Sequence, residues 1–145
     1  MSIGSYERVA CCVDLTERSR LVQARAAEVA DMAGARLSIV HVTPPIATAP
    51  SGVIPTKSLG PGTAIDIRAS LDAWIEELAS HDPDAEAELV EGLGVGETLC
   101  EWSETNGISL MVLGSREGGV ASALGSTASY MVRHAPCDVL IVRPS

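Results

Sequence analysis

Apolar residues in this chain gather into short, nearly continuous runs that are separated by amphipathic stretches. Continuous apolar runs are typical of strands that are covered on both faces, as in parallel sheets. They predict strands at Val9–Val13, Leu37–Val42, Ile108–Leu113 and Val139–Val142. A further run, Ala85–Val90, alternates apolar and acidic residues, which predicts a strand that is exposed on one face and near a sheet edge.

Apolar residues at helical spacing fill much of the chain between these strands. The first helix is predicted over residues 17–33, after Thr16 as a candidate cap and before Gly34, because a glycine commonly ends a helix. Its apolar stripe comprises Val22, Ala26, Val29, Ala30 and Ala33. A second helical pattern begins near Ile65, and its apolar face comprises Ile67, Leu71, Trp74, Ile75 and Leu78.

Two shorter helices are predicted in the second half of the chain. One carries Leu99 and Trp102 and stops at Asn106-Gly107. The other runs from about residue 126 to residue 134, before Pro136. Strands and helices therefore alternate, which predicts the α/β class with a parallel sheet covered by helices on both faces.

The chain has 145 residues, so residues 1–145 are predicted to form a single domain with its own core. Residues 43–64 contain five prolines and three glycines, which rule out a long helix or strand there. A connection of about 20 residues is long for a compact domain, and it is typical of a lid, a partner surface or a disordered segment.

The stretch Ser109–Thr127 combines a buried strand, a glycine-rich loop and the start of a helix. The loop begins at Gly114 and also holds Gly118, Gly119 and Gly125, and Ser126 and Thr127 are candidate helix caps. A strand, a glycine loop and a helix N-terminus in this order can offer several backbone N–H donors to an anion. Taken by itself, the same stretch also fits a flexible surface loop.

The position of this loop relative to the first strand decides whether it builds a site. In parallel α/β sheets, ligands bind beyond the C-terminal ends of the strands, where the strand order reverses. The first strand ends at Asp14 and the fourth at Gly114. If these strands are neighbours, Asp14 and the Gly114–Ser126 loop face one crevice, but periodicity leaves their adjacency open.

Composition narrows the functional classes. The chain is 46% hydrophobic and 20% charged, as is ordinary for a soluble globular protein. Its net charge of -9 argues against nucleic-acid or anionic-membrane binding, but it leaves room for a small anionic ligand. No apolar run approaches the roughly 20 residues of a membrane helix, and charged residues interrupt the early apolar run where a signal peptide would need its core. We therefore expect a cytoplasmic protein.

The four cysteines are predicted to be core thiols. Cys11 and Cys12 are adjacent on a strand and so point to opposite faces, while Cys100 and Cys137 stand alone. The chain has no CxxC motif and no Cys/His spacing typical of a metal site. Neither a disulfide framework nor a protein-bound metal centre is therefore expected.

Other motifs carry less information. Gly92-x-Gly94-x-Gly96 hints at a dinucleotide fingerprint, but its last spacing is one residue short and it suits a loop leading into a helix. The chain has no Gly-x4-Gly-Lys-[Ser/Thr], which excludes P-loop chemistry. Ser126, His134 and Asp138 could form a triad, but no nucleophile-elbow sequence accompanies them. No catalytic residue is predicted, and the chain is not expected to be an enzyme.

Motifs along nearly the whole chain resemble the universal stress protein (UspA-like) family. Residues Val9–Thr16 resemble its opening strand and Val-Asp-x-Ser/Thr turn, and Gly34–Val42 resembles its second strand. The most specific part comprises Leu113–Arg116, Gly125–Thr127 and Val132–Val142.

The resemblance implies a three-layer α/β/α fold of the adenine nucleotide alpha hydrolase-like type. Its five-stranded parallel sheet would have the order 3-2-1-4-5, which makes the tips of the first and fourth strands neighbours. The resemblance also implies a homodimer, often built through the last strand. One branch of the family binds ATP or a related nucleotide through a G-x2-G-x9-G-[ST] loop, whereas another branch lacks that loop.

Carried over to this sequence, the family pattern places the base and ribose near the first two strands. Asp14 would hold the ribose or the adenine edge, and Val42 would meet adenine. A carboxylate that caps the following helix is the alternative for Asp14. Arg116 would be either a phosphate partner or a solvated loop charge.

The phosphate end of the pattern falls on the glycine loop. Gly114 and Ser115 would approach the phosphates, and Gly125, Ser126 and Thr127 would donate to them from the helix start. Ser126 could equally serve as a plain helix cap, and one side chain can do both.

This loop departs from the nucleotide pattern. Glu117 stands where the second glycine belongs, and ten residues separate Gly114 from Gly125 where the motif has twelve. The shorter spacing resembles the branch without nucleotide, although Gly118-Gly119 could supply donors one position later.

The leading hypothesis is a cytoplasmic, dimeric stress-response regulatory protein with an unknown protein partner. It would bind ATP or another adenine nucleotide, with or without Mg²⁺, and would not turn it over efficiently. The alternatives are a nucleotide-free dimeric interaction module and, less favoured, a nucleotide hydrolase.

Overall fold

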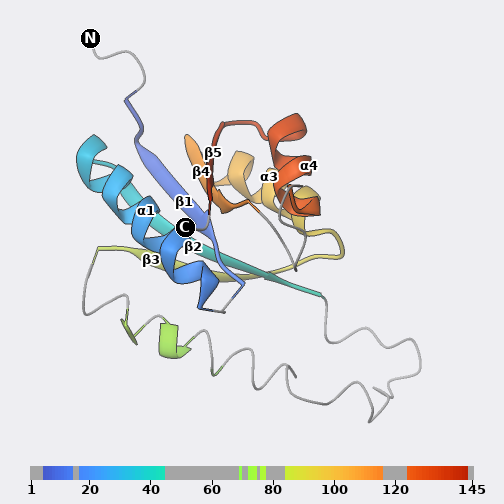
Figure 1. Ribbon diagram of the computed structural model, residues 1–145, viewed down its shortest axis with the longest axis horizontal. Helices are drawn as coiled ribbons and strands as arrows, with labels where there is room; N and C mark the ends of the chain where they lie inside the picture. Colours follow the sequence, from blue (N-terminus) through green and yellow to red (C-terminus); the bar gives the residue numbers. More distant parts are fainter. Residues whose placement is uncertain are drawn as a thin grey trace.

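A computed structural model shows one five-stranded sheet (Figure 1). The structure describes residues 5–14, 17–44, 69, 72–74, 76–77, 84–115 and 124–143. The strands are β1 Arg8–Cys12, β2 Arg36–Thr43, β3 Glu86–Glu91, β4 Leu110–Gly114 and β5 Asp138–Val142. All neighbours pair in parallel in the order β3-β2-β1-β4-β5, which confirms the topology that the family resemblance implied.

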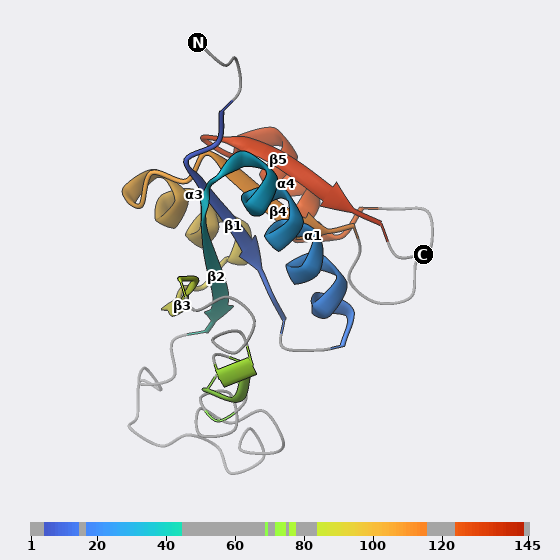
Figure 2. The same ribbon diagram turned by 90° about the vertical axis from the view of Figure 1, so that its left-hand side faces the viewer.

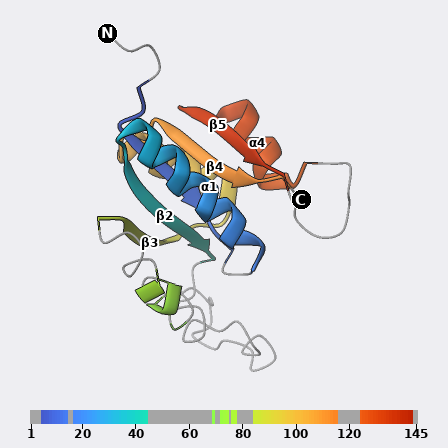
Figure 3. The same ribbon diagram turned by 60° about the vertical axis from the view of Figure 1, so that its left-hand side comes forward.

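Helices cover both faces of this sheet. They are α1 Arg18–Ala33, α3 Val95–Thr105 and α4 Ser126–His134. Helix α1 lies on one face, and α3 and α4 lie together on the other (Figures 2 and 3). Of the helical pattern that begins near Ile65, residues 69, 72–74 and 76–77 are helical and Trp74 is buried, while its other positions lie outside the described residues.

The helix ends follow local backbone chemistry. Helix α1 ends at Gly34, which has a left-handed φ of 65°, as the sequence predicted. Gly125 occupies the N-cap position of α4, and Ser126 is already the first helical residue. The prediction that Ser126 or Thr127 caps this helix is therefore wrong. The Gly125 N–H bonds to the Ser115 carbonyl at 2.9 Å, which fixes Gly125 in the extended conformation that a cap residue needs. Thr16, the predicted cap of α1, lies outside the described residues.

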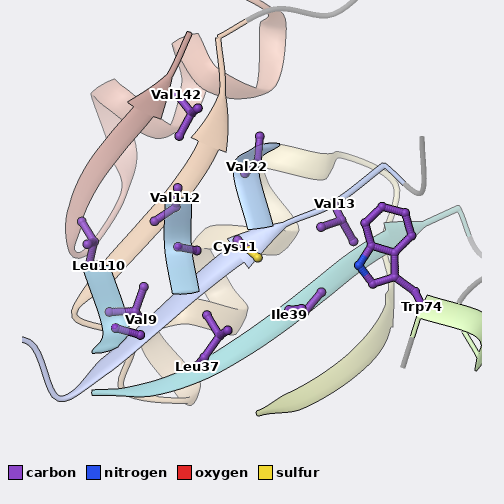
Figure 4. Close-up of a cluster of buried hydrophobic side chains, with 12 residues drawn as sticks. Val9, Cys11, Val13, Val22, Leu37, Ile39, Trp74, Leu110, Val112 and Val142 are labelled. Atoms are coloured by element: carbon purple, nitrogen blue, oxygen red, sulfur yellow. The ribbon is translucent and has the colours of Figure 1, made fainter. Parts of the chain in front are cut away.

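Two apolar clusters form the core, one on each face of the sheet. Figure 4 shows the cluster under α1, where side chains of β1, β2 and β4 meet Val22 and Trp74. The second cluster packs Leu99, Trp102 and Met131 of α3 and α4 against the other face. These two clusters explain why β1, β2 and β4 have apolar residues on both faces, because each strand supplies both clusters.

The cysteines follow the same division. Cys11 belongs to the cluster under α1 and Cys12 packs against the opposite one, which confirms that they point to opposite faces. Cys100 and Cys137 also pack against the second cluster, and none of the four cysteines forms a disulfide bond.

Strand β3 lies at the edge of the sheet, as its alternating pattern predicted. Its residues mostly alternate between exposed and half-buried, and its first carboxylate meets arginines of β2 and β1. Glu86 pairs with Arg36 at 2.7 Å and with Arg8 at 3.5 Å. In the described part of the chain, no helix combines the length and the apolar character that crossing a bilayer would require.

Candidate functional site

The tips of β1 and β4 lie side by side, which settles the adjacency that periodicity left open. The two strands pair in parallel with Cys11 opposite Val112. Two residues further on, this register brings Val13 level with Gly114. Because the strand order reverses between β1 and β4, these tips form the edge where parallel α/β sheets bind ligands.

A cavity of about 170 Å³ opens at this edge. Of the residues that the sequence assigned to the site, it brings together Asp14, Val42, Gly114, Gly125 and Thr127. Its remaining lining residues are Cys12, Val13, Arg18, Ser19, Val22, His41, Val95, Leu113 and Ala128.

The other assigned residues do not line this cavity. Ser115 and Ser126 each neighbour a lining residue in the chain, but the cavity does not reach them. Arg116 lies outside the described residues, as do Glu117 and Gly118-Gly119 of the same loop.

Asp14 is held by the start of α1. Its backbone N–H donates to the Ser19 hydroxyl at 2.8 Å, and that hydroxyl donates to the Asp14 carboxylate at 2.6 Å. The Arg18 guanidinium lies 3.9 Å from the second carboxylate oxygen. These contacts tie Asp14 to side chains in the first turn of α1, whose N-cap residue is Glu17. The side chain is still 54% exposed and lines the cavity, so it stays accessible to a ligand.

At the end of β2, main-chain N–H and C=O groups face the cavity. In a parallel ladder, successive residues direct their N–H and C=O groups alternately to the two neighbouring strands. The Val40 carbonyl accepts from Val13 on the β1 side, and the Thr43 carbonyl accepts from Gly92 after β3. The N–H and C=O of Val42 therefore face the β1 side, beyond the point where β1 ends.

The two ends of the glycine loop are tied to each other. The Ser115 N–H bonds to the Val142 carbonyl at 3.0 Å, and the Gly125 N–H bonds back to the Ser115 carbonyl at 2.9 Å. Helix α4 therefore starts beside the tip of β4. A helix N-terminus carries roughly half a positive charge, so this end of the cavity favours an anion. A Cβ at Gly114 would lie 3.4 Å from Val22 of α1, at the limit of an ordinary van der Waals contact.

Sequence reasoning missed part of the cavity wall. Arg18, Ser19 and Val22 come from the first turns of α1, Val95 from the start of α3, and His41 from β2. His41 was expected only to be a strand residue, which it is, but its ring also lines the cavity. Helical spacing did contain a signal for Ser19, because it precedes the predicted core position Val22 by three residues and so shares its face.

Packing explains the Gly92-x-Gly94-x-Gly96 motif without a ligand. Gly94 is the N-cap of α3, as expected of a loop that leads into a helix. A Cβ at Gly96 would lie 2.6 Å from the Tyr130 ring of α4, and a Cβ at Gly92 would overlap Thr98. Glycine is therefore required at both positions for close packing.

The structure rules out the imagined triad of Ser126, His134 and Asp138. Ser126 and His134 are the first and last residues of α4, so the helix rise separates them by about 12 Å. Asp138 accepts a hydrogen bond from the Tyr6 hydroxyl at 2.9 Å. These residues cannot pass a proton directly to one another.

Comparisons with known proteins agree on one family. The model of the universal stress protein family matches residues 5–143. The universal stress protein A homolog 1 of Coxiella burnetii is 30% identical over 148 residues, which cover 94% of this chain and 96% of that protein.

Solved structures of the same kind share the fold. The universal stress protein UspA from Lactobacillus plantarum is 23% identical with a TM-score of 0.75, over 97% of this chain and 100% of that one. A universal stress protein in complex with cAMP is 25% identical with a TM-score of 0.74, over 97% of this chain and 99% of that one.

Proposed function

The chain belongs to the universal stress protein family, and we propose that within it the protein is a stress-response regulator that binds an adenine nucleotide. The nucleotide would occupy the cavity at the tips of β1 and β4 and would not be turned over efficiently. The observation that carries this proposal is the convergence of Asp14, Val42, Gly114, Gly125 and Thr127 on one cavity, although they come from distant parts of the chain. A relative that was solved with cAMP supports it.

The cavity fits part of a nucleotide rather than a whole one. Pockets that enclose drug-sized ligands have volumes of about 300–1,000 Å³, whereas this one has about 170 Å³. Its apolar walls, Val22, Val42, Val95 and Leu113, suit the flat faces of a purine. The base would therefore be enclosed, while the sugar and phosphates would lie across the mouth.

Each end of the cavity suits a different part of the ligand. The Val42 main chain would meet the adenine edge, and the Asp14 carboxylate would accept hydrogen bonds from ribose hydroxyls. At the other end, the Gly125 and Thr127 region would receive a phosphate at the α4 N-terminus. Ser115, Ser126 and Arg116 would contact phosphates only beyond the cavity mouth, and we assign them this role from the family pattern alone.

The phosphate end also determines which nucleotide is preferred. A carboxylate about 4 Å from a phosphate costs about 1 kcal/mol in water and up to about 4 at an effective dielectric constant of 20. A helix N-terminus contributes roughly 0.3–2 kcal/mol of stabilisation. Glu117 belongs to the loop that would cover the phosphates, so each additional phosphate group would add little binding free energy here. We therefore expect AMP or cAMP to bind at least as well as ATP, with or without Mg²⁺.

The assembly and the location are further parts of the proposal. We propose a homodimer through β5, which is an edge strand whose central residues Val139–Ile141 are only half-buried. Val132 on the neighbouring α4 is 56% exposed. We also propose a cytoplasmic location and a protein partner that recognises the nucleotide-bound form.

Two other functions are distinguishable by experiment. A nucleotide-free interaction module would share the fold and the dimer, and the short loop with Glu117 favours it. In calorimetry, that module would show no heat of binding with any adenine nucleotide at millimolar concentration. A hydrolase would show metal-dependent phosphate release that survives stringent purification and disappears in Ser126→Ala.

Isothermal titration calorimetry with cAMP, AMP, ADP and ATP tests the proposal, using Gly125→Val as the site variant. The Gly125 φ of -62° and ψ of 162° are accessible to valine, so we expect this variant to fold. Its side chain would stand at the cavity, and we expect nucleotide binding to be lost. Ala24→Val, on the exposed side of α1, adds the same side chain away from the cavity and should leave binding unchanged. Unchanged affinity in Gly125→Val would show that the site is elsewhere.

A further inference from the structure

The pairing of β1 with β2 stops before β2 itself ends. The register between them runs to Cys12 opposite Val40, whereas β2 continues beside β3 to Thr43 opposite Glu91. Within the described residues, the last main-chain hydrogen bond between β1 and β2 is from the Val13 N–H to the Val40 carbonyl, at 2.9 Å. Beyond this point, the next bond of a continuing ladder would join the Val42 N–H to the Val13 carbonyl.

A side chain takes that position instead. The His41 Nδ1 lies 2.7 Å from the Val13 carbonyl oxygen. A carbonyl can only accept a hydrogen bond, so Nδ1 carries the hydrogen and donates it. The half-buried ring therefore bridges the ends of the two strands at the wall of the cavity.

We propose that His41 is a positioning residue for the nucleotide base. By donating to the Val13 carbonyl, it ends the β1–β2 ladder one step early and leaves the main-chain edge of Val42 directed at the cavity. This inference rests on the proposed function, because the base is the ligand that this edge would bind.

The consequence is a preference among purines. The Val42 edge offers an N–H donor and a C=O acceptor. Adenine presents an amino donor beside a ring-nitrogen acceptor, which complements that edge, whereas guanine presents an oxo acceptor at the place of the amino group. If His41 did not occupy the Val13 carbonyl, the Val42 N–H would turn to that carbonyl and the base would lose its donor.

Two variants separate positioning from packing. His41→Leu fills similar space without a donor. His41→Asn keeps an N–H donor near the Nδ1 position, because the amide nitrogen of asparagine lies at a similar distance along the side chain. Thermal unfolding of both variants shows whether the fold is kept. If His41→Leu does not fold, weaker AMP binding by folded His41→Asn than by the wild type would overturn the inference, because this variant keeps the N–H donor.

The first measurement uses the ligand-free protein and follows hydrogen exchange of the Val42 amide by NMR. In His41→Leu we expect this amide to exchange about 10-fold more slowly than in the wild type, because it gains the Val13 carbonyl as a partner. His41→Asn should exchange like the wild type. An unchanged Val42 exchange rate in His41→Leu would overturn the inference.

The second measurement is the affinity for AMP and GMP by calorimetry. We expect AMP to bind His41→Leu about 3- to 10-fold more weakly than the wild type, which corresponds to one hydrogen bond. We expect His41→Asn to restore AMP binding and GMP to bind the wild type more weakly than AMP does. A wild type that binds no adenine nucleotide would refute the proposed function, whereas wild-type binding that His41→Leu leaves unchanged would refute the role of His41 alone.

Discussion

The contact between α3 and α4 leaves no room for a side chain at position 96. A Cβ built on Gly96 would lie 2.6 Å from Cδ1, 2.7 Å from Cγ and 2.9 Å from Cβ of Tyr130. The Tyr130 Cβ is fixed to the α4 backbone, so a rotation of the ring alone cannot clear the overlap. Substituting Gly96 with alanine must therefore push the two helices apart.

Two opposing effects set the size of the change in stability. Replacing glycine with alanine inside a helix stabilises by roughly 0.5–1 kcal/mol. Inserting a methyl group into a packed contact costs about 1–3 kcal/mol. We expect the contact to dominate, so that Gly96→Ala lowers the free energy of unfolding by about 1 kcal/mol.

Urea unfolding of a double-mutant cycle with Tyr130→Ala tests this reasoning. Tyr130→Ala removes the contacts with Cδ1 and Cγ and keeps only the 2.9 Å contact with Cβ, so the same Gly96→Ala change should cost less stability than in the wild type, and the difference between the two backgrounds measures the contact with the ring. Glu101→Ala, on the exposed side of α3, is a control that should stay within about 0.5 kcal/mol of the wild type. Stabilisation by Gly96→Ala in the wild-type background would refute the packing explanation of the glycine motif.

Two further predictions concern the first strand and the turn after it. Ser19→Ala removes both contacts with Asp14, and because Ser19 is only 5% exposed we expect the free energy of unfolding to fall by about 1–3 kcal/mol in a urea titration. The exposed Ser5→Ala is its control, and equal effects of the two variants would contradict the role of Ser19. Burial, and to a smaller extent the neighbouring Cys12, raises the pKa of the Cys11 thiol. The reactive thiolate is therefore disfavoured, and at pH 8 we expect iodoacetamide to alkylate Cys11 only after unfolding, as peptide mass spectrometry would show. Rapid alkylation of Cys11 in the folded protein would contradict its burial.

The sequence was most informative where burial alone determines the pattern. The apolar runs located β1, β2, β4 and β5, and the Ala/Glu alternation located the edge strand β3, because one of its faces is exposed. Hydrophobic periodicity does not indicate which strands are neighbours. The order of the sheet was therefore predicted from the family resemblance. The connection through α3 carries the chain from β3 at one edge of the sheet to β4 on the other side of β1, and the hydrophobic pattern of the sequence does not specify this crossover.

The residues that the sequence missed share one physical cause. Ser19 and His41 act through atoms that are distant in sequence or belong to the main chain: Ser19 meets the Asp14 carboxylate and amide, and His41 meets the Val13 carbonyl. Residue type reveals neither contact. The misplaced cap at Ser126 has a similar origin, because the hydrogen bond to Ser115 makes Gly125 the cap residue.

The short glycine loop departs from the nucleotide pattern less than its length suggests. The hydrogen bond from Gly125 to Ser115 joins the two ends of the loop, so the start of α4 is fixed against the tip of β4 by residues outside the shortened part. Under the proposed function, loop length would then affect which residues cover a phosphate, but not where the helix N-terminus lies. If a nucleotide binds as proposed, a shorter loop with an acidic residue would reduce the stabilisation of a long phosphate chain, while the part of the cavity formed by β1, β2 and α1 would stay the same. In the proposed function, the preference among nucleotides would therefore depend on Glu117, and the choice of adenine would depend on the end of β2.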